Sequence, residues 1–98
     1  MIDRSSLPTY TLLSSIKTVL NRCMTDMNHD DYTMAWLRMR DDVSPIMTIL
    51  QKRIEKERKY IKDFYRIVHT YQDVMYDLIV TVRKNSTKYP LANKEIGK

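Results

Sequence analysis

A chain of 98 residues is long enough for one small domain and too short for a large core. Its 17 Lys and Arg against 12 Asp and Glu give a net charge of +5, which favours a polyanionic partner. A sheet fold, an internal disulfide framework and a membrane span are excluded, because alternating strands are missing, Cys23 is the only cysteine, and no apolar run approaches about twenty residues. We also expect no secretory signal, and a single cysteine fits a reducing compartment.

The first predicted helix runs from Pro8 to about Met27. Proline suits the first turn of a helix, and the apolar residues that follow recur at three- and four-residue spacing, as in a helix with one buried face. Cys23 lies in this apolar stripe, so a structural thiol is expected there, whereas Lys17 and Arg22 fall outside it. The stripe consists of Leu12, Leu13, Ile16, Val19, Leu20, Cys23, Met24 and Met27.

A turn at residues 28–31 is predicted to lead into a second helix that Asp side chains cap. Trp36, with Met34 and Met39, is expected in the core rather than in a partner-binding patch, because apolar residues at helical spacing are usually buried. Ser44-Pro45 then predicts a kink or tight break, because proline disfavours helical geometry in the preceding residue. The apolar pattern continues across it, so both pieces should face the same partner.

The segment from Ser44 to Lys84 carries a heptad pattern over five repeats. Ten of its eleven seam positions are apolar, and the exception is Glu57. This pattern predicts one helix about 60 Å long whose apolar stripe another helix covers. Because little of the chain remains to cover it, we expect self-association. The residues predicted to form the core or dimer contact are Leu50, Ile54, Ile61, Phe64, Val68 and Tyr71.

The C-terminal part is harder to divide. The β-branched run Ile79–Val82 is a poorer helix former, so a break between His69 and Asp73, followed by a short C-terminal helix, is an alternative to one continuous helix. Beyond it the apolar period ends. We therefore predict an all-α fold, a helical hairpin with one long helix, continuous or kinked, plus a short C-terminal helix. It forms one helical domain over residues 1–84, followed by a disordered basic tail over residues 85–98.

A row of cations follows the opposite face of the long predicted helix, spaced four, three, three and four residues apart. Such a row can follow nucleic-acid phosphates without reading bases, although most charge runs are ordinary solvated faces. Glu55, Glu57 and Asp63 can neutralise part of it. Tyr60 and Tyr65 flank the row but are placed toward the seam, so a duplex is favoured over a single strand, which needs stacking platforms. The row is Lys52, Lys56, Lys59, Lys62 and Arg66.

Catalytic, metal and cofactor sites are not predicted. His29, Asp30 and Asp31 are better explained as turn and cap residues than as metal ligands. One glycine cannot build a phosphate loop, and no nucleophile, base and orienting group can be assembled. We therefore expect a binding protein and not an enzyme.

Residues 16–76 resemble the small RNA-silencing suppressors of insect nodaviruses. Three short stretches carry the resemblance. One is Ile16-Lys17-Thr18 with Met24, and another is Val74-Met75-Tyr76, which is similar to a Val-Ala-Tyr of that family. The stretch between them is similar to the family's Arg-x-Asp-Leu-x-x-Leu-x-x-x-Leu-x-Lys run and consists here of Arg40, Asp42, Val43, Ile46, Leu50 and Lys52.

The resemblance implies a homodimeric four-helix bundle of antiparallel long helices, lying along double-stranded RNA in the host cell cytoplasm. Such proteins bind long and small interfering duplexes independent of sequence and block their dicing and loading. Arg40, Lys52 and Lys59 match basic positions of the family, and Arg38 can replace the second arginine that Asp41 displaces. The predicted RNA-binding residues are therefore Arg38, Arg40, Lys52, Lys56, Lys59, Lys62 and Arg66.

Two other classes stay open. A coiled-coil adaptor would bind an acidic or helical protein partner through the seam and show no duplex affinity at moderate salt. An interfacial membrane helix would also pair a basic face with an apolar one, but Glu57 and Tyr71 on the seam and the acidic residues on the polar face argue against it. The sequence does not indicate whether the protein also binds a host silencing protein.

Overall fold

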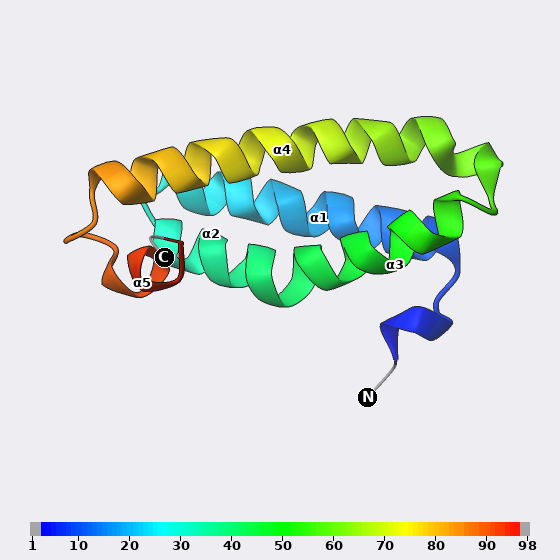
Figure 1. Cartoon of the computed structure of the whole chain (residues 1–98), viewed down its shortest axis with the longest axis horizontal. Helices are drawn as coiled ribbons and strands as arrows, with labels where there is room; N and C mark the ends of the chain where they lie inside the picture. The colour runs from blue at the N-terminus through cyan, green and yellow to red at the C-terminus, as the bar shows by residue number, and fades with distance from the viewer. Residues whose placement is uncertain (1–2, 97–98) are drawn as a thin grey trace.

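The computed structural model describes residues 3–96, and over these residues the fold is all-helical, as predicted (Figure 1). A single turn of 3-10 helix, η1 (Arg4–Ser6), precedes the first α-helix. One π-helical turn, η2 (Met39–Val43), joins α2 to α3, and a second 3-10 turn, η3 (Arg58–Tyr60), lies between α3 and α4. The α-helices are α1 (Thr9–Asn28), α2 (Tyr32–Arg38), α3 (Ser44–Ile54), α4 (Ile61–Lys84) and α5 (Pro90–Ile96).

Three lines of helix pack side by side (Figure 1). The line formed by α2, η2 and α3 runs antiparallel to α1, and α4 runs back along both, parallel to α1. The short α5 folds under the end of α4 and packs against α4 and α2. The two ends of this bundle therefore differ: α3 turns into α4 at one, and the C-terminal segment closes the other.

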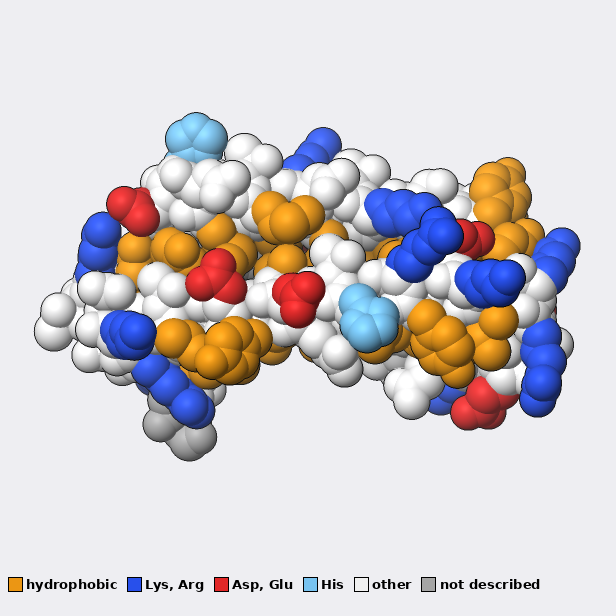
Figure 2. Space-filling model, turned by 90° about the horizontal axis from the view of Figure 1, so that it is seen from above, with side chains coloured by type: hydrophobic (Ala, Val, Ile, Leu, Met, Phe, Trp, Pro, Cys, Tyr) orange, Lys and Arg blue, Asp and Glu red, His pale blue; other side chains and the backbone are white. Residues whose placement is uncertain are grey.

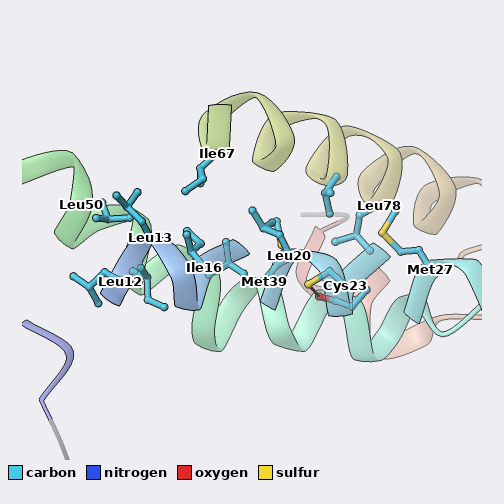
Figure 3. Close-up of a cluster of buried hydrophobic side chains, with 14 of the residues drawn as sticks. Leu12, Leu13, Ile16, Leu20, Cys23, Met27, Met39, Leu50, Ile67 and Leu78 are labelled. Carbon is cyan, nitrogen blue, oxygen red and sulfur yellow. Dashed lines mark hydrogen bonds between the residues drawn. The ribbon is translucent and has the colours of Figure 1, made fainter. Parts of the chain in front are cut away.

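Helix α1 supplies the centre of the core, as its apolar stripe predicts. Leu12, Ile16 and Cys23 are fully buried, and Figure 3 shows the stripe lying between α4 and the α2–α3 line. Asp31 caps α2 by accepting a hydrogen bond from the amide of Met34, which confirms the predicted turn and cap. The spacing of apolar and capping residues was enough to predict the buried stripe of α1 and the cap of α2, because both depend on the geometry of a single helix.

Pro45 neither ends nor breaks the second helix. Ser44 keeps right-handed helical angles (φ −60°, ψ −43°), and the distortion is absorbed by the π-helical turn just before it. A proline cannot donate to the carbonyl four residues earlier, which here belongs to Asp41. The guanidinium of Arg4 donates to that carbonyl instead, at 3.0 Å. Of the two predicted forms, the tight break is therefore wrong, and a π-helical turn, a distortion that often accompanies a kink, takes its place.

The predicted single helix over residues 44–84 is wrong. It ends at Ile54, the chain turns at Glu55–Glu57, and η3 leads into α4. Glu57, the polar exception on the seam, has non-helical angles (φ −106°, ψ 74°), and its carboxylate accepts a hydrogen bond from Thr9 at 2.5 Å. The heptad period persists across the turn because α3 and α4 bury their stripes in one shared core.

The seam residues lie in this intramolecular core. Leu50, Ile54 and Phe64 are buried, and three others pack partly buried against the same cluster: Ile61, Val68 and Tyr71. The expectation of self-association started from a seam that the chain could not cover. Because α1 and the two neighbouring helices cover most of it, that reason no longer applies.

The C-terminal expectations also need correction. Helix α4 continues through residues 69–73, and the β-branched run stays helical because Leu78 and Val82 are fully buried. The predicted disorder is wrong for residues 85–96: Tyr89, Ala92 and Ile96 are buried, at a spacing that gives α5 one apolar face. The last two residues of the predicted tail, 97 and 98, lie outside the described residues.

Candidate nucleic-acid interface

Six cationic side chains surround the turn between α3 and α4. They come from the end of α3, the turn itself, η3 and the first two turns of α4, and all six are exposed. Figure 2, a view onto α4, shows several Lys and Arg side chains at this end of the molecule, with acidic side chains among them. We call this set the basic corner: Lys52, Lys56, Arg58, Lys59, Lys62 and Arg66.

The basic corner contains all five residues of the predicted row, but on a bent path and not on one straight helix. Sequence analysis left out Arg58, which the straight-helix spacing had placed off the row; the turn brings it to the same corner. The sequence could have indicated Arg58, because it directly precedes Lys59 of the predicted row. A bend gathers cations from two helices within one small area, which raises the local potential compared with a row of the same charges.

None of the six takes part in an ion pair within residues 3–96. The ammonium of Lys59 lies 4.9 Å from the ring centroid of Tyr60, a contact that leaves its charge in place. The nearby Glu57 is held by Thr9. The expected neutralisation by Glu55, Glu57 and Asp63 therefore does not take the form of ion pairs.

The corner is held in place by the N-terminal segment. The guanidinium of Arg53 donates to the backbone carbonyls of Ser5 and Leu7, and lies 3.5 Å from the hydroxyl of Thr9. Thr9 in turn donates to Glu57. Each of these contacts joins residues 44 to 48 positions apart, and together they tie the turn that presents the cations to the N-terminal segment. The position of the turn between α3 and α4 therefore depends on contacts with the N-terminal segment.

Arg38 and Arg40, also predicted to bind RNA, lie in ion pairs. The Arg38 guanidinium donates to Asp26 at 2.7 Å, and both side chains are partly buried. That hydrogen bond raises the pKa of Arg38. Arg40 donates to Asp41 at 2.7 Å and to Glu95 at 2.6 Å, and its pKa is raised by Asp41 first and Glu95 second. These two cations are already matched by carboxylates of the same chain.

Tyr60 and Tyr65 were both predicted to lie toward the apolar seam, but only Tyr60 does. Tyr60 packs partly buried against the core, as expected, but Tyr65 is 55% exposed. It follows the buried Phe64, and one residue further along a helix turns the side chain by about 100°. The ring of Tyr65 therefore lies on the solvent side of α4, near Lys62 and Arg66 in sequence.

A groove of about 260 Å³ lies between α1 and α4 beside the basic corner. Arg66 belongs to both, and α1 contributes Lys17, which was not among the predicted RNA-binding residues. Sequence offers no signal for this proximity, because the two residues are 49 positions apart. The lining residues are Lys17, Leu20, Asn21, Arg66, Ile67 and Thr70.

The remaining candidates have structural roles. Cys23 is fully buried with its sulfur 3.7 Å from the carbonyl of Ala35, and burial raises the pKa of the thiol to about 11, so it is protonated at neutral pH. Trp36 is partly buried and donates to Glu95. Met39 is fully buried, whereas Met34 is 40% exposed, so the predicted core placement is right for two of the three.

Two further observations concern metals and membranes. His29 bonds to the carbonyl of Thr25 at 2.8 Å, and no group of three or more potential ligands gathers among residues 3–96. Over the same residues, no helix combines the length and apolar character needed to cross a bilayer.

The chain matches no known protein family, and no curated protein or solved structure is significantly similar to it. The candidate interface is therefore defined by its own exposed charges. The resemblance over residues 16–76 remains a prediction.

Proposed function

We propose that the protein binds double-stranded RNA through its phosphates, independent of base sequence, with the basic corner as the contact surface. The main support for this proposal is that the cations of the basic corner are exposed and, in the described part of the chain, are not paired with carboxylates. Six cations stand at one corner without an ion pair within residues 3–96. An unpaired cation next to a phosphate releases condensed counterions, and this release supplies most of the affinity of sequence-independent binding.

The choice of a duplex follows from the shape of the surface. The cations come from two helices that meet at the turn, so they form a patch and not a single line. A patch can contact phosphates on both sides of a groove, whereas a single strand is usually held by aromatic stacking between cations. Tyr65 is the one strongly exposed aromatic residue in the segment that carries the corner. In A-form RNA the base edges are hidden, so shape and backbone contacts dominate.

The biological role that we propose comes from the resemblance to nodavirus silencing suppressors. A protein that covers long duplexes and small interfering duplexes in the host cytoplasm shields them from dicing and loading. A homodimer, implied by the same resemblance, would present two basic corners and double the phosphate contacts. An adaptor that uses the seam is less supported, because Leu50, Ile54 and Phe64 face the core of their own chain.

The test measures the affinity for duplex RNA, duplex DNA and single-stranded RNA at fixed salt, and then over a salt series. We expect preference for duplex RNA whatever its sequence, with an affinity that falls steeply as salt rises. Lys59→Glu should weaken all duplexes alike, by about tenfold, since one phosphate contact is replaced by a repulsive charge. Light scattering on the same samples measures the oligomeric state.

The matched control is Arg83→Glu, which makes the same charge reversal at an exposed site at the far end of α4. Equal losses in the two variants would show that only net charge matters and would reject the basic corner as the contact surface. Loss of helicity in Lys59→Glu would show a structural role for the lysine. A wild-type protein without duplex affinity at moderate salt would support an adaptor role instead.

A further inference from the structure

We infer that the groove between α1 and α4 holds a backbone phosphate of the bound RNA strand, with Lys17 and Arg66 as its two cationic sides. The inference rests on the proposed function for the identity of the strand. It adds a second helix, α1, to the contact surface and assigns a binding role to Lys17, which lies far from the basic corner in sequence.

The groove is built from two matching pairs of side chains. Lys17 and Asn21 lie one turn apart on α1, and Arg66 and Thr70 lie one turn apart on α4. Residues four apart share one face of a helix, so each helix presents a cation and a neutral polar group to the groove. Between them, the apolar Leu20 and Ile67 form the floor, and Figure 3 shows Ile67 reaching from α4 toward the side of α1 that carries Leu20.

The charges of this groove favour an anion. Both charged lining residues are cations, and no carboxylate lines the groove. Within residues 3–96 the side chains of Lys17, Asn21 and Arg66 make no hydrogen bond or ion pair with another side chain, so their donors are available. Thr70 is less available, since its hydroxyl donates to the carbonyl of Arg66 at 3.2 Å. Two like charges across one groove repel, and an anion between them relieves that repulsion.

The groove has room for a phosphodiester with its sugar and not only for a single phosphate group. About 260 Å³ is more than one phosphate group fills, and the remaining wall is apolar. Leu20 and Ile67 are almost fully buried at the base of the groove, so the sugar would pack mainly against the aliphatic stems of Lys17 and Arg66. The charged ends of these two residues and the amide of Asn21 would contact the phosphate oxygens. Because Arg66 also belongs to the basic corner, a strand that crosses the corner can continue directly into the groove.

The test compares Lys17→Gln with Arg22→Gln, a second exposed cation of α1 that does not line the groove. Removing one phosphate contact should lower the slope of log affinity against log salt by about one and weaken every duplex alike. We expect this for Lys17→Gln and an unchanged slope for Arg22→Gln. Thermal unfolding of both variants checks that the fold is retained.

A second measurement needs no RNA. Inorganic phosphate is titrated into the wild-type protein, and backbone amide signals are followed by two-dimensional NMR. We expect saturable shifts at Asn21 and Thr70 that are lost in Lys17→Gln and kept in Arg22→Gln. Shifts confined to the basic corner, or none, would overturn the inference.

The failures of the two proposals can be told apart. If the wild-type protein binds duplexes and both variants show the wild-type salt slope, the groove inference is overturned and the proposed function stands. If the wild-type protein ignores duplexes, the proposed function is overturned, and the phosphate titration alone decides whether the groove is an anion site.

Discussion

The basic corner and the contact between α2 and α5 carry similar charges in opposite circumstances. At the basic corner, cations such as Lys59 and Lys62 are exposed and make no ion pair within residues 3–96. On the side where α2 meets α5, Arg38 is paired with Asp26, and Arg40 with Asp41 and Glu95. A cation with a carboxylate at hydrogen-bonding distance contributes little field further away. The comparison therefore separates cations that hold the fold from cations that remain available to a ligand.

The C-terminal segment docks at this contact between α2 and α5. Glu95 accepts hydrogen bonds from the indole of Trp36 and from Arg40, and the ring of Tyr89 packs against Tyr32 at a centroid distance of 5.2 Å. Removing these contacts should affect stability and leave RNA affinity unchanged. Three predictions use this difference.

The largest effect is expected from Tyr89→Ala. The ring is 5% exposed, and truncating a buried aromatic side chain should lower the free energy of unfolding by about 3 kcal/mol. Denaturant unfolding measures the change. Tyr76→Ala, at a site that is 72% exposed, is the control and should change the free energy by no more than about 0.5 kcal/mol. Equal effects would mean that the C-terminal segment does not dock as described.

The second prediction replaces one cation of each group, paired and unpaired, with glutamine. Arg38→Gln leaves the carboxylate of Asp26 without its ionic partner, so the unfolding midpoint should fall, while the salt slope of duplex binding stays unchanged. Lys62→Gln should do the reverse: stability is retained and the slope falls by about one. If Arg38→Gln lowers the slope instead, the division of cations into the two groups is wrong.

The smallest effect concerns pH. The hydrogen bond from Trp36, and then the one from Arg40, lowers the pKa of Glu95. A lowered pKa in the folded state means that the carboxylate stabilises the fold at pH values above the ordinary glutamate pKa of about 4.3, and that this contribution is lost as the pH falls through the folded value.

Trp36 is the only tryptophan, so its fluorescence measures this step directly. We expect the emission to change below about pH 4.3 as the indole loses its charged acceptor. Glu95→Gln should remove the step, whereas Asp73→Asn, at an exposed position of α4, should retain it. Retention of the step in Glu95→Gln would assign the change to another carboxyl group.

The amino-acid sequence by itself determined the helical class, the buried face of α1, the cap at Asp31 and the burial of Cys23. Each depends on residue spacing within one or two turns, which a single helix already expresses. It also determined five residues of the basic corner, because charged side chains without an apolar period lie on the solvent face. The dimer and the viral role rest on the resemblance, the RNA ligand rests also on the basic corner, and all three remain predictions.

Only the tertiary structure decided where the long heptad segment breaks. A stripe with a 3.5-residue period reads the same whether it faces a second chain or α1 of its own chain, so the pattern across Glu57 did not reveal the turn. The turn depends on Thr9 and Arg53 meeting across more than forty residues. The pairing of Arg40 with Glu95 and the approach of Lys17 to Arg66 have the same origin. These contacts join residues distant in sequence, and local periodicity carries no information about which distant side chains will be brought together.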